Sequence, residues 1–160
     1  MVGNSNVELA EEDVMYGKYL TFRIGQGIYG IEIKYVTEII GVQEITAIPH
    51  TSDYVRGIIN LRGQIVPVID CSMRFGGEEI VFTERTCIVE LGVDGMSIGL
   101  IVDDVDEVIT IDDENIQQPP RTGDDGMADA FVKKIGLYDG NVKQLLDIDQ
   151  IFEEQVTSIS

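Results

Sequence analysis

The chain has 160 residues, of which 29 are acidic and 11 are basic, so its formal net charge is −18. A protein that neutralises nucleic-acid phosphates needs clustered lysines and arginines, and this charge therefore excludes a nucleic-acid partner. The same charge opposes an anionic membrane surface, and no run approaches the roughly 18 apolar residues of a spanning helix. We expect no direct membrane insertion and, from the first ten residues, no secretory signal.

The hydrophobic fraction of 44% is typical of a folded domain rather than of a disordered chain. Cys71 and Cys87 are the only cysteines and lie in apolar stretches, so we expect no disulfide framework and a reducing cytoplasm. His50 is the single histidine and sits in a turn-like stretch, so no two-histidine metal site can form. The composition therefore predicts no metal, no cofactor and no enzymatic activity.

The N-terminal part of the chain contains a polar arm followed by a hairpin. Residues 1–15 are polar and acidic and predict a flexible arm. Residues 19–24 and 28–33 alternate apolar and polar side chains around a glycine-rich turn, which predicts two paired strands. Val36 and Ile40 then recur at helical spacing, so we expect a helix of one to two turns over residues 34–40.

The rest of the chain repeats the pattern of short β-branched runs joined by glycine turns. The predicted strand pairs are residues 55–61 with 64–70, 86–91 with 96–102, and 131–137 with 141–147. Residues 148–154 predict a short C-terminal helix. Many short strands at this spacing indicate an all-β protein of the barrel class with a few short helices.

The two halves of the chain resemble each other. The series Val-x-Glu occurs at residues 36–38 and again at residues 105–107, and a turn glycine follows at Gly63 and at Gly140. The second copy is longer between these features, and its extra residues fall in the turn-rich stretch 117–126. We therefore predict two similar small barrels that pack against each other.

Two motifs are typical of known binding sites, but the residues around them disfavour such sites here. Residues 25–30 match the dinucleotide-binding glycine pattern, but a strand follows them where that site needs a helix. The carboxylates of residues 103–114 lack the glycine turn and the alternating ligands of a calcium loop. A hairpin turn and a solvated acidic stretch, with Asp112 or Asp113 capping a short turn, are the favoured interpretations.

The stretch Asn60-Leu61-Arg62-Gly63 is the most informative part of the sequence. Gly63 supplies the positive φ of a tight strand connection, which presents the Arg62 guanidinium at a strand end. An ion pair with Glu38 would either be a weak surface pair or belong to a partner interface. Val36 and Val108 occupy equivalent places in the two repeats, and core packing and an apolar partner patch both remain open for them.

These segments together resemble the CheW family of bacterial chemotaxis coupling proteins over residues 19–152. The segments that carry the resemblance are Tyr29-Gly30-Ile31, Val36-x-Glu38-Ile39-Ile40, Arg56-Gly57-Ile58-Ile59-Asn60-Leu61-Arg62-Gly63, Val66-Pro67-Val68-Ile69-Asp70 and Leu145-Leu146-Asp147. Polar residues at Lys133-Lys134 and Lys143-Gln144 depart from the aliphatic pattern of the family, which leaves the pairing of the last strands open.

The resemblance implies a fold and a function. The fold is two five-stranded SH3-like β-barrels packed side by side with a short C-terminal helix, in one domain over residues 16–154. The two subdomains span about residues 17–80 and 81–154, with strand exchange between them left open. The implied function is a non-enzymatic adaptor that couples methyl-accepting chemoreceptor tips to the regulatory domain of the chemotaxis histidine kinase. Its place is the cytoplasm, at the inner face of the membrane through receptor arrays.

The resemblance also implies the partner-binding residues. They are Glu38, Arg62, Val36, Gly57, Gly63, Ile88, Val105 and Val108. Two other functions are kept as alternatives: an acidic β module that binds a small ligand or metal, and a hydrolase that uses carboxylates. A thermal shift with calcium or a metabolite would favour the first alternative, and turnover would favour the second.

Overall fold

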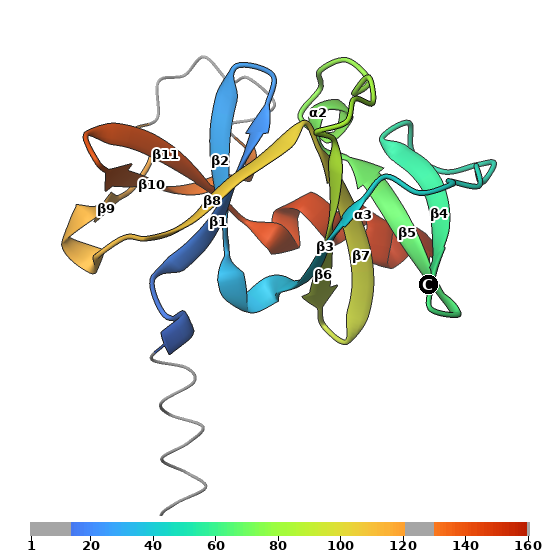
Figure 1. Cartoon of the computed structure of the whole chain (residues 1–160), viewed down its shortest axis with the longest axis horizontal. Helices are drawn as coiled ribbons and strands as arrows, with labels where there is room; N and C mark the ends of the chain where they lie inside the picture. The colour runs from blue at the N-terminus through green and yellow to red at the C-terminus, as the bar shows by residue number, and fades with distance from the viewer. Residues whose placement is uncertain (1–13, 121–129, 160) are drawn as a thin grey trace, which may run out of the picture.

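The computed structural model describes residues 14–120 and 130–159, with side chains described as far as residue 153 (Figure 1). Residues 1–13 of the predicted arm lie outside the described residues. Two β-sheets lie side by side, and α3 runs from the end of β11 across to the side of the second sheet (Figure 1). No helix of the described residues is long and apolar enough to cross a membrane.

Sheet A has six strands in the order β8-β1-β2-β11-β10-β9, and sheet B has five in the order β3-β6-β7-β5-β4. The strands of sheet A are β1 (Lys18–Ile24), β2 (Gly27–Glu32), β8 (Asp104–Thr110), β9 (Ile116–Gln117), β10 (Val132–Tyr138) and β11 (Asn141–Leu146). Those of sheet B are β3 (Val36–Gly41), β4 (Val55–Leu61), β5 (Gln64–Asp70), β6 (Cys87–Val93) and β7 (Met96–Val102). The helical elements are η1 (Ile33–Tyr35), α2 (Cys71–Arg74), η2 (Asp113–Asn115) and α3 (Ile148–Ile159).

The all-β class and the four predicted hairpins are confirmed. β1 pairs with β2, β4 with β5, β6 with β7 and β10 with β11, all antiparallel. The last of these pairs includes the lysines that depart from the family pattern, so their polarity does not prevent strand pairing. The dinucleotide-like glycine pattern spans the turn between β1 and β2, where Gly25 has a φ of 58°, and the first residues of β2.

The helix predicted over residues 34–40 is wrong. Only a single 3-10 turn, η1, forms there, and β3 follows it directly. The strand contains a bulge between Val36 and Glu38, and its burial still alternates. The charged Glu38 lies on the half-buried side and the apolar Ile39 on the exposed side, so the residue types do not show the alternation that marks a strand. Residues 104–110, for which we expected no element, form the strand β8, which pairs with β1.

The internal repeat reappears in the strand register. Val36 pairs with Leu91 and Glu38 with Glu90 across β3 and β6, and the bulge lies between them. Val105, which corresponds to Val36, pairs with Phe22 across β8 and β1, and a bulge follows there as well. Each sheet therefore contains two strands from the other half of the chain, β1 and β2 in sheet A and β6 and β7 in sheet B. The subdomain boundaries at residues 80 and 81 stay a prediction.

One hydrophobic core connects the two sheets. Its buried side chains include Leu20 and Phe22 from sheet A, Leu100 from sheet B, and Ile151 and Phe152 from α3. Cys71 is buried in this core and Cys87 is partly exposed, and both are free thiols, as the sequence predicted. Because α3 contributes to a core shared by both sheets, it helps to hold them together.

A buried aspartate anchors the end of β5. Asp70 is fully buried, and its carboxylate accepts bonds from the Arg56 guanidinium at 2.9 Å, from the Ile80 amide at 2.9 Å and from the Met73 amide at 3.1 Å. The Met73 bond caps the N-terminus of α2. All these donors compensate the loss of hydration, so this buried charge is well satisfied.

Gly57 allows the two edges of sheet B to approach each other. β3 and β4 are the outer strands, and Thr46, in the segment after β3, pairs with Ile58 of β4 through two backbone bonds of 2.9 Å. Gly57 has a φ of 141°, and a Cβ at this position would lie 2.1 Å from the Thr46 carbonyl oxygen. Only glycine fits this close approach of two backbones.

Gly57→Ala is therefore expected to lower the free energy of unfolding by about 3 kcal/mol or more, because backbone strain and a steric clash each cost roughly 1–3 kcal/mol. Chemical denaturation measures this loss. Gly95→Ala is the matched control, since Gly95 also has a positive φ but has open space where the Cβ would lie. Equal losses in the two variants would mean that the approach of Thr46 does not constrain residue 57.

Candidate partner-binding surface

The β4–β5 turn presents Arg62 in a backbone conformation that is unusual for arginine. Arg62 has a φ of 54° and Gly63 a φ of 84°, so the positive φ predicted for Gly63 is confirmed and extends to Arg62. The Gly63 amide donates to the Asn60 side-chain oxygen at 2.8 Å. The β6–β7 and β10–β11 turns place Asp94 and Asp139 where Arg62 stands, and the β1–β2 turn places Gly25 there. Aspartate tolerates this conformation better than arginine does, so the arginine is not there for the sake of the turn.

Arg62 lies between two carboxylates. Its guanidinium contacts Glu38 at 2.7 Å, as predicted, and its distance to Oε1 of Glu90 is 3.9 Å. The Arg62 side chain is 66% exposed and the Glu38 side chain 36%, whereas only 4% of the Glu90 side chain is exposed. The hydrogen bond to Glu38 and its negative charge raise the pKa of Arg62. The surface therefore carries one guanidinium, one accessible carboxylate and one buried carboxylate.

The sequence interpretation missed Glu90. β6 reads Cys-Ile-Val-Glu-Leu-Gly-Val, and a single glutamate among apolar residues in a central strand was the signal that could have identified it. Its proximity to Glu38 and Arg62 depends on the pairing of β3 with β6 across the two halves of the chain. That long-range pairing is not visible in any local pattern.

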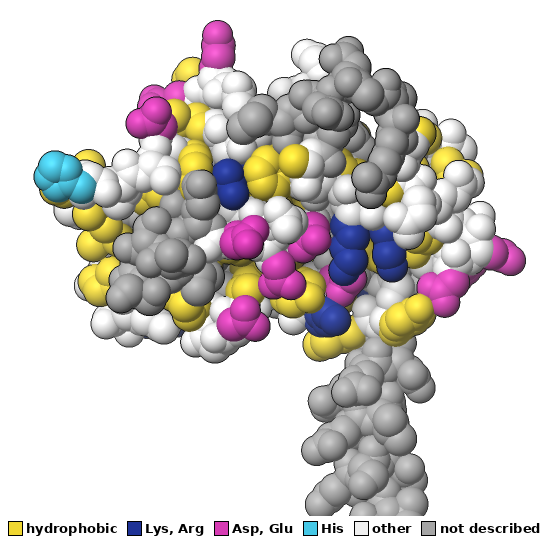
Figure 2. Space-filling model, turned by 180° about the vertical axis from the view of Figure 1, so that it is seen from behind, with side chains coloured by type: hydrophobic (Ala, Val, Ile, Leu, Met, Phe, Trp, Pro, Cys, Tyr) yellow, Lys and Arg dark blue, Asp and Glu magenta, His cyan; other side chains and the backbone are white. Residues whose placement is uncertain are grey.

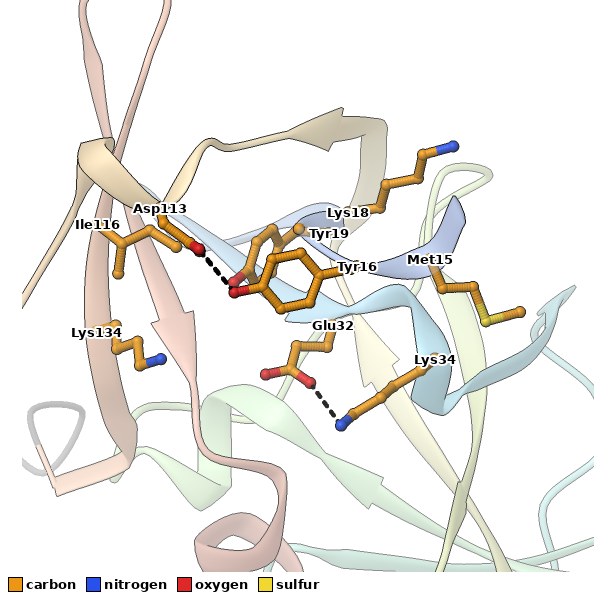
Figure 3. Close-up of a pocket in the computed structure, with 10 residues that line it drawn as sticks. Met15, Tyr16, Lys18, Tyr19, Glu32, Lys34, Asp113, Ile116 and Lys134 are labelled. Carbon is orange, nitrogen blue, oxygen red and sulfur yellow. Dashed lines mark hydrogen bonds and ion pairs between the residues drawn. The ribbon is translucent and has the colours of Figure 1, made fainter. Parts of the chain in front are cut away.

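A separate cavity of about 460 Å³ lies on sheet A beside η1 and η2 (Figure 3). Its acidic groups already have partners within the cavity: Asp113 accepts from the Tyr16 hydroxyl at 2.8 Å, and Glu32 pairs with Lys34 at 3.3 Å. The bond to Asp113 raises the pKa of Tyr16. Asp112, expected as a cap, makes no capping bond with its side chain, and Asp113 bonds Tyr16 instead.

In the part of the chain that the structure describes, no group of three histidine, cysteine, aspartate or glutamate side chains could hold a metal ion. Figure 2 shows acidic, basic and hydrophobic side chains interspersed over the face opposite to that of Figure 1. The acidic stretch after β7 is mainly the strand β8 rather than a calcium loop.

The chain is similar to known proteins of one family. The model of the CheW-like domain matches residues 18–156. The chain belongs to the CheW family.

Named relatives cover most of the chain. A probable chemotaxis protein CheW of Rhizobium etli is 35% identical over 135 residues, which are 84% of this chain and 86% of that protein. The chemotaxis protein CheW of Klebsiella aerogenes is 29% identical over 155 residues, covering 97% and 93% of the two chains. The crystal structure of the scaffolding protein TtCheW from Thermoanaerobacter tengcongensis superposes with a TM-score of 0.78 at 36% identity, covering 86% and 92%.

The structure brings together some of the residues that the CheW resemblance implies. Glu38, Arg62 and Gly63 lie at one place on sheet B. Gly57 lies in β4, the strand before the Arg62-Gly63 turn, and the close approach of Thr46 explains why this residue is a glycine. We call Glu38, Arg62, Gly63 and Glu90 together the Arg62 surface.

The apolar residues implied by the resemblance have different surroundings. Val108 is 53% exposed on β8 of sheet A and is available for a partner. Val36 and Val105 are partly buried and pack against the core. Ile88 is fully buried in β6, so it cannot lie on a partner-binding surface in this conformation and the expectation of direct contact is corrected. The strand register makes Val105 the counterpart of Val36 and Ile39 the counterpart of Val108, so the expected equivalence of Val36 and Val108 is corrected.

Arg62→Glu is expected to lower the melting temperature by several degrees, although Arg62 itself is exposed. The variant would place a third carboxylate beside Glu38 and the buried Glu90, where water screens the repulsion poorly. Thermal unfolding followed by circular dichroism measures the change. Adding Glu90→Gln to the same chain should restore most of the loss, and a melting temperature that stays low would contradict the electrostatic cause.

Proposed function

We propose that the chain is a non-enzymatic adaptor that couples methyl-accepting chemoreceptor tips to the regulatory domain of the chemotaxis histidine kinase. It would act in the cytoplasm, at the inner face of the membrane through receptor arrays. The observation that supports this most is an arginine held at a strained turn in a CheW-family chain, where the other described turns of this kind carry aspartate or glycine. A residue that the turn does not favour is better explained by a contact outside the chain.

The chemistry of the Arg62 surface suits protein recognition. A guanidinium offers a planar set of donors, and arginine is a frequent anchor of protein interfaces. Glu38 orients it with a bond of 2.7 Å, and the Gly63 amide donates to the Asn60 side chain within the turn that carries it. Val108, exposed on the other sheet, is a separate apolar contact point for a second partner.

The experiment that tests this function measures the affinity of the chain for a chemoreceptor signalling fragment and, separately, for the kinase regulatory domain. Arg62→Gln is the test variant, because it removes the guanidinium without adding a negative charge. Arg85→Gln is the matched control, since Arg85 is 75% exposed and lies 4.0 Å from a carboxylate of Asp104. Both variants change the net charge equally.

Arg62→Gln is expected to weaken binding to at least one partner by roughly 30- to 1,000-fold, as the loss of an interface anchor does. Arg85→Gln is expected to bind within about threefold of the unchanged chain, because a peripheral charge contributes little. If Arg62→Gln bound both partners as tightly as the unchanged chain, the Arg62 surface would not be part of the interface. Absence of binding by the unchanged chain to either partner would overturn the adaptor function itself.

A further inference from the structure

We propose that Glu90 is a positioning residue for Arg62, and that the Arg62 guanidinium moves from Glu38 to Glu90 when a partner docks. Glu38 is then free to accept a basic group, an arginine or a lysine, from the partner protein. This inference rests on the proposed adaptor function and identifies the chemistry of the partner surface.

Glu90 carries a buried oxygen that lacks a partner. The residue is 3% exposed, and its Oε1 atom has no hydrogen-bond donor in the described structure. A buried carboxylate oxygen without a donor is costly, and Asp70 shows how this chain satisfies such a group elsewhere, with three donors. The unpartnered oxygen is therefore a departure from the rest of the fold.

The Arg62 guanidinium lies 3.9 Å from that oxygen. A charge-assisted hydrogen bond between nitrogen and oxygen spans about 2.7–2.9 Å, so a movement of about 1 Å would complete it. The Arg62 side chain is mostly exposed and can make that movement by rotating its own dihedral angles. Glu38 now holds the guanidinium at 2.7 Å, which makes Glu38 the competitor of Glu90.

The internal repeat provides a comparison within the same molecule. Thr21 occupies on β1 the place that Glu90 occupies on β6, beside Glu107, the counterpart of Glu38. The Thr21 hydroxyl donates to the Glu107 carbonyl at 2.9 Å and accepts from the Glu107 amide at 3.1 Å. A small polar residue that bonds the adjacent backbone thus satisfies this position in sheet A. Glu90 is instead a charged residue whose need for a donor is unmet.

A docking partner supplies the reason for the transfer. Two carboxylates and one guanidinium leave the Arg62 surface with one excess negative charge, on a chain whose net charge is −18. A basic partner residue that binds Glu38 competes with Arg62 for the same oxygens and removes water from the surface. Arg62 then gains a bond to Glu90, and both carboxylates end with a cation.

The experiment compares Glu90→Gln, Glu38→Gln and their combination, first in the free protein. In the unchanged background, Glu90→Gln should raise the melting temperature, because it removes a buried charge that lacks a donor and faces Glu38. In the Glu38→Gln background, Arg62 is already on Glu90, so the same substitution should lower the melting temperature. Glu107→Gln is the control for charge alone and should not reverse the effect of Glu90→Gln.

The second arm measures affinity for the receptor fragment and the kinase regulatory domain. Glu90→Gln should weaken binding about tenfold to the partner that needs Arg62, and should have no effect when Arg62→Gln is already present. In the free protein, a change of melting temperature by Glu90→Gln that has the same sign in the unchanged and the Glu38→Gln backgrounds would overturn the transfer, whether or not any partner binds. Equal weakening with and without Arg62 would also overturn it, whereas failure of the unchanged chain to bind would overturn only the adaptor function.

Discussion

The close approach of Thr46 to Gly57 places the charged groups of the candidate surface. β3 and β4 are the opposite edges of sheet B, and strand order alone would leave them apart. The Thr46–Ile58 bridge joins the segment after β3 to β4, and only a residue without a Cβ permits it. Arg62 at the end of β4 consequently meets Glu38 on β3 and faces Glu90 on β6. Through this backbone approach, Gly57 contributes to the geometry of the site.

The duplicated architecture shows where the two halves diverge. In both sheets, a bulged pairing joins strands from different halves of the chain: β8 pairs with β1 in sheet A, and β3 pairs with β6 in sheet B. In sheet A the polar position beside the bulge is Thr21, which is satisfied by backbone groups, and the hairpin turn carries Asp139. In sheet B the same positions are Glu90 and Arg62, which are less favourable for the isolated fold. Sites that bind partners commonly carry such local costs.

Local pattern predicted much of the fold. Strand pairs joined by glycine turns, such as residues 55–61 with 64–70, were recognisable because alternation and turn chemistry act over a few residues. The same reasoning failed for residues 34–40, since in β3 the charged Glu38 lies on the half-buried side and the apolar Ile39 on the exposed side. It also gave no warning that Ile88 is buried or that Glu90 lies beside Glu38, because both facts depend on pairing between distant strands. The turn pattern pointed to Arg62 with Glu38 and the family resemblance gave them a partner-binding role, but neither identified Glu90 as the third member of the cluster.

Amide hydrogen exchange at Thr46 and Ile58 tests most directly whether this backbone contact holds the surface together. Each of these amides donates to the other residue's carbonyl at 2.9 Å. The account predicts that both exchange as slowly as the paired amides of β4 and β5, through opening of the sheet as a whole. Rapid exchange at Thr46 and Ile58, with the β4–β5 amides still protected, would show that the edges of sheet B separate freely and would contradict it.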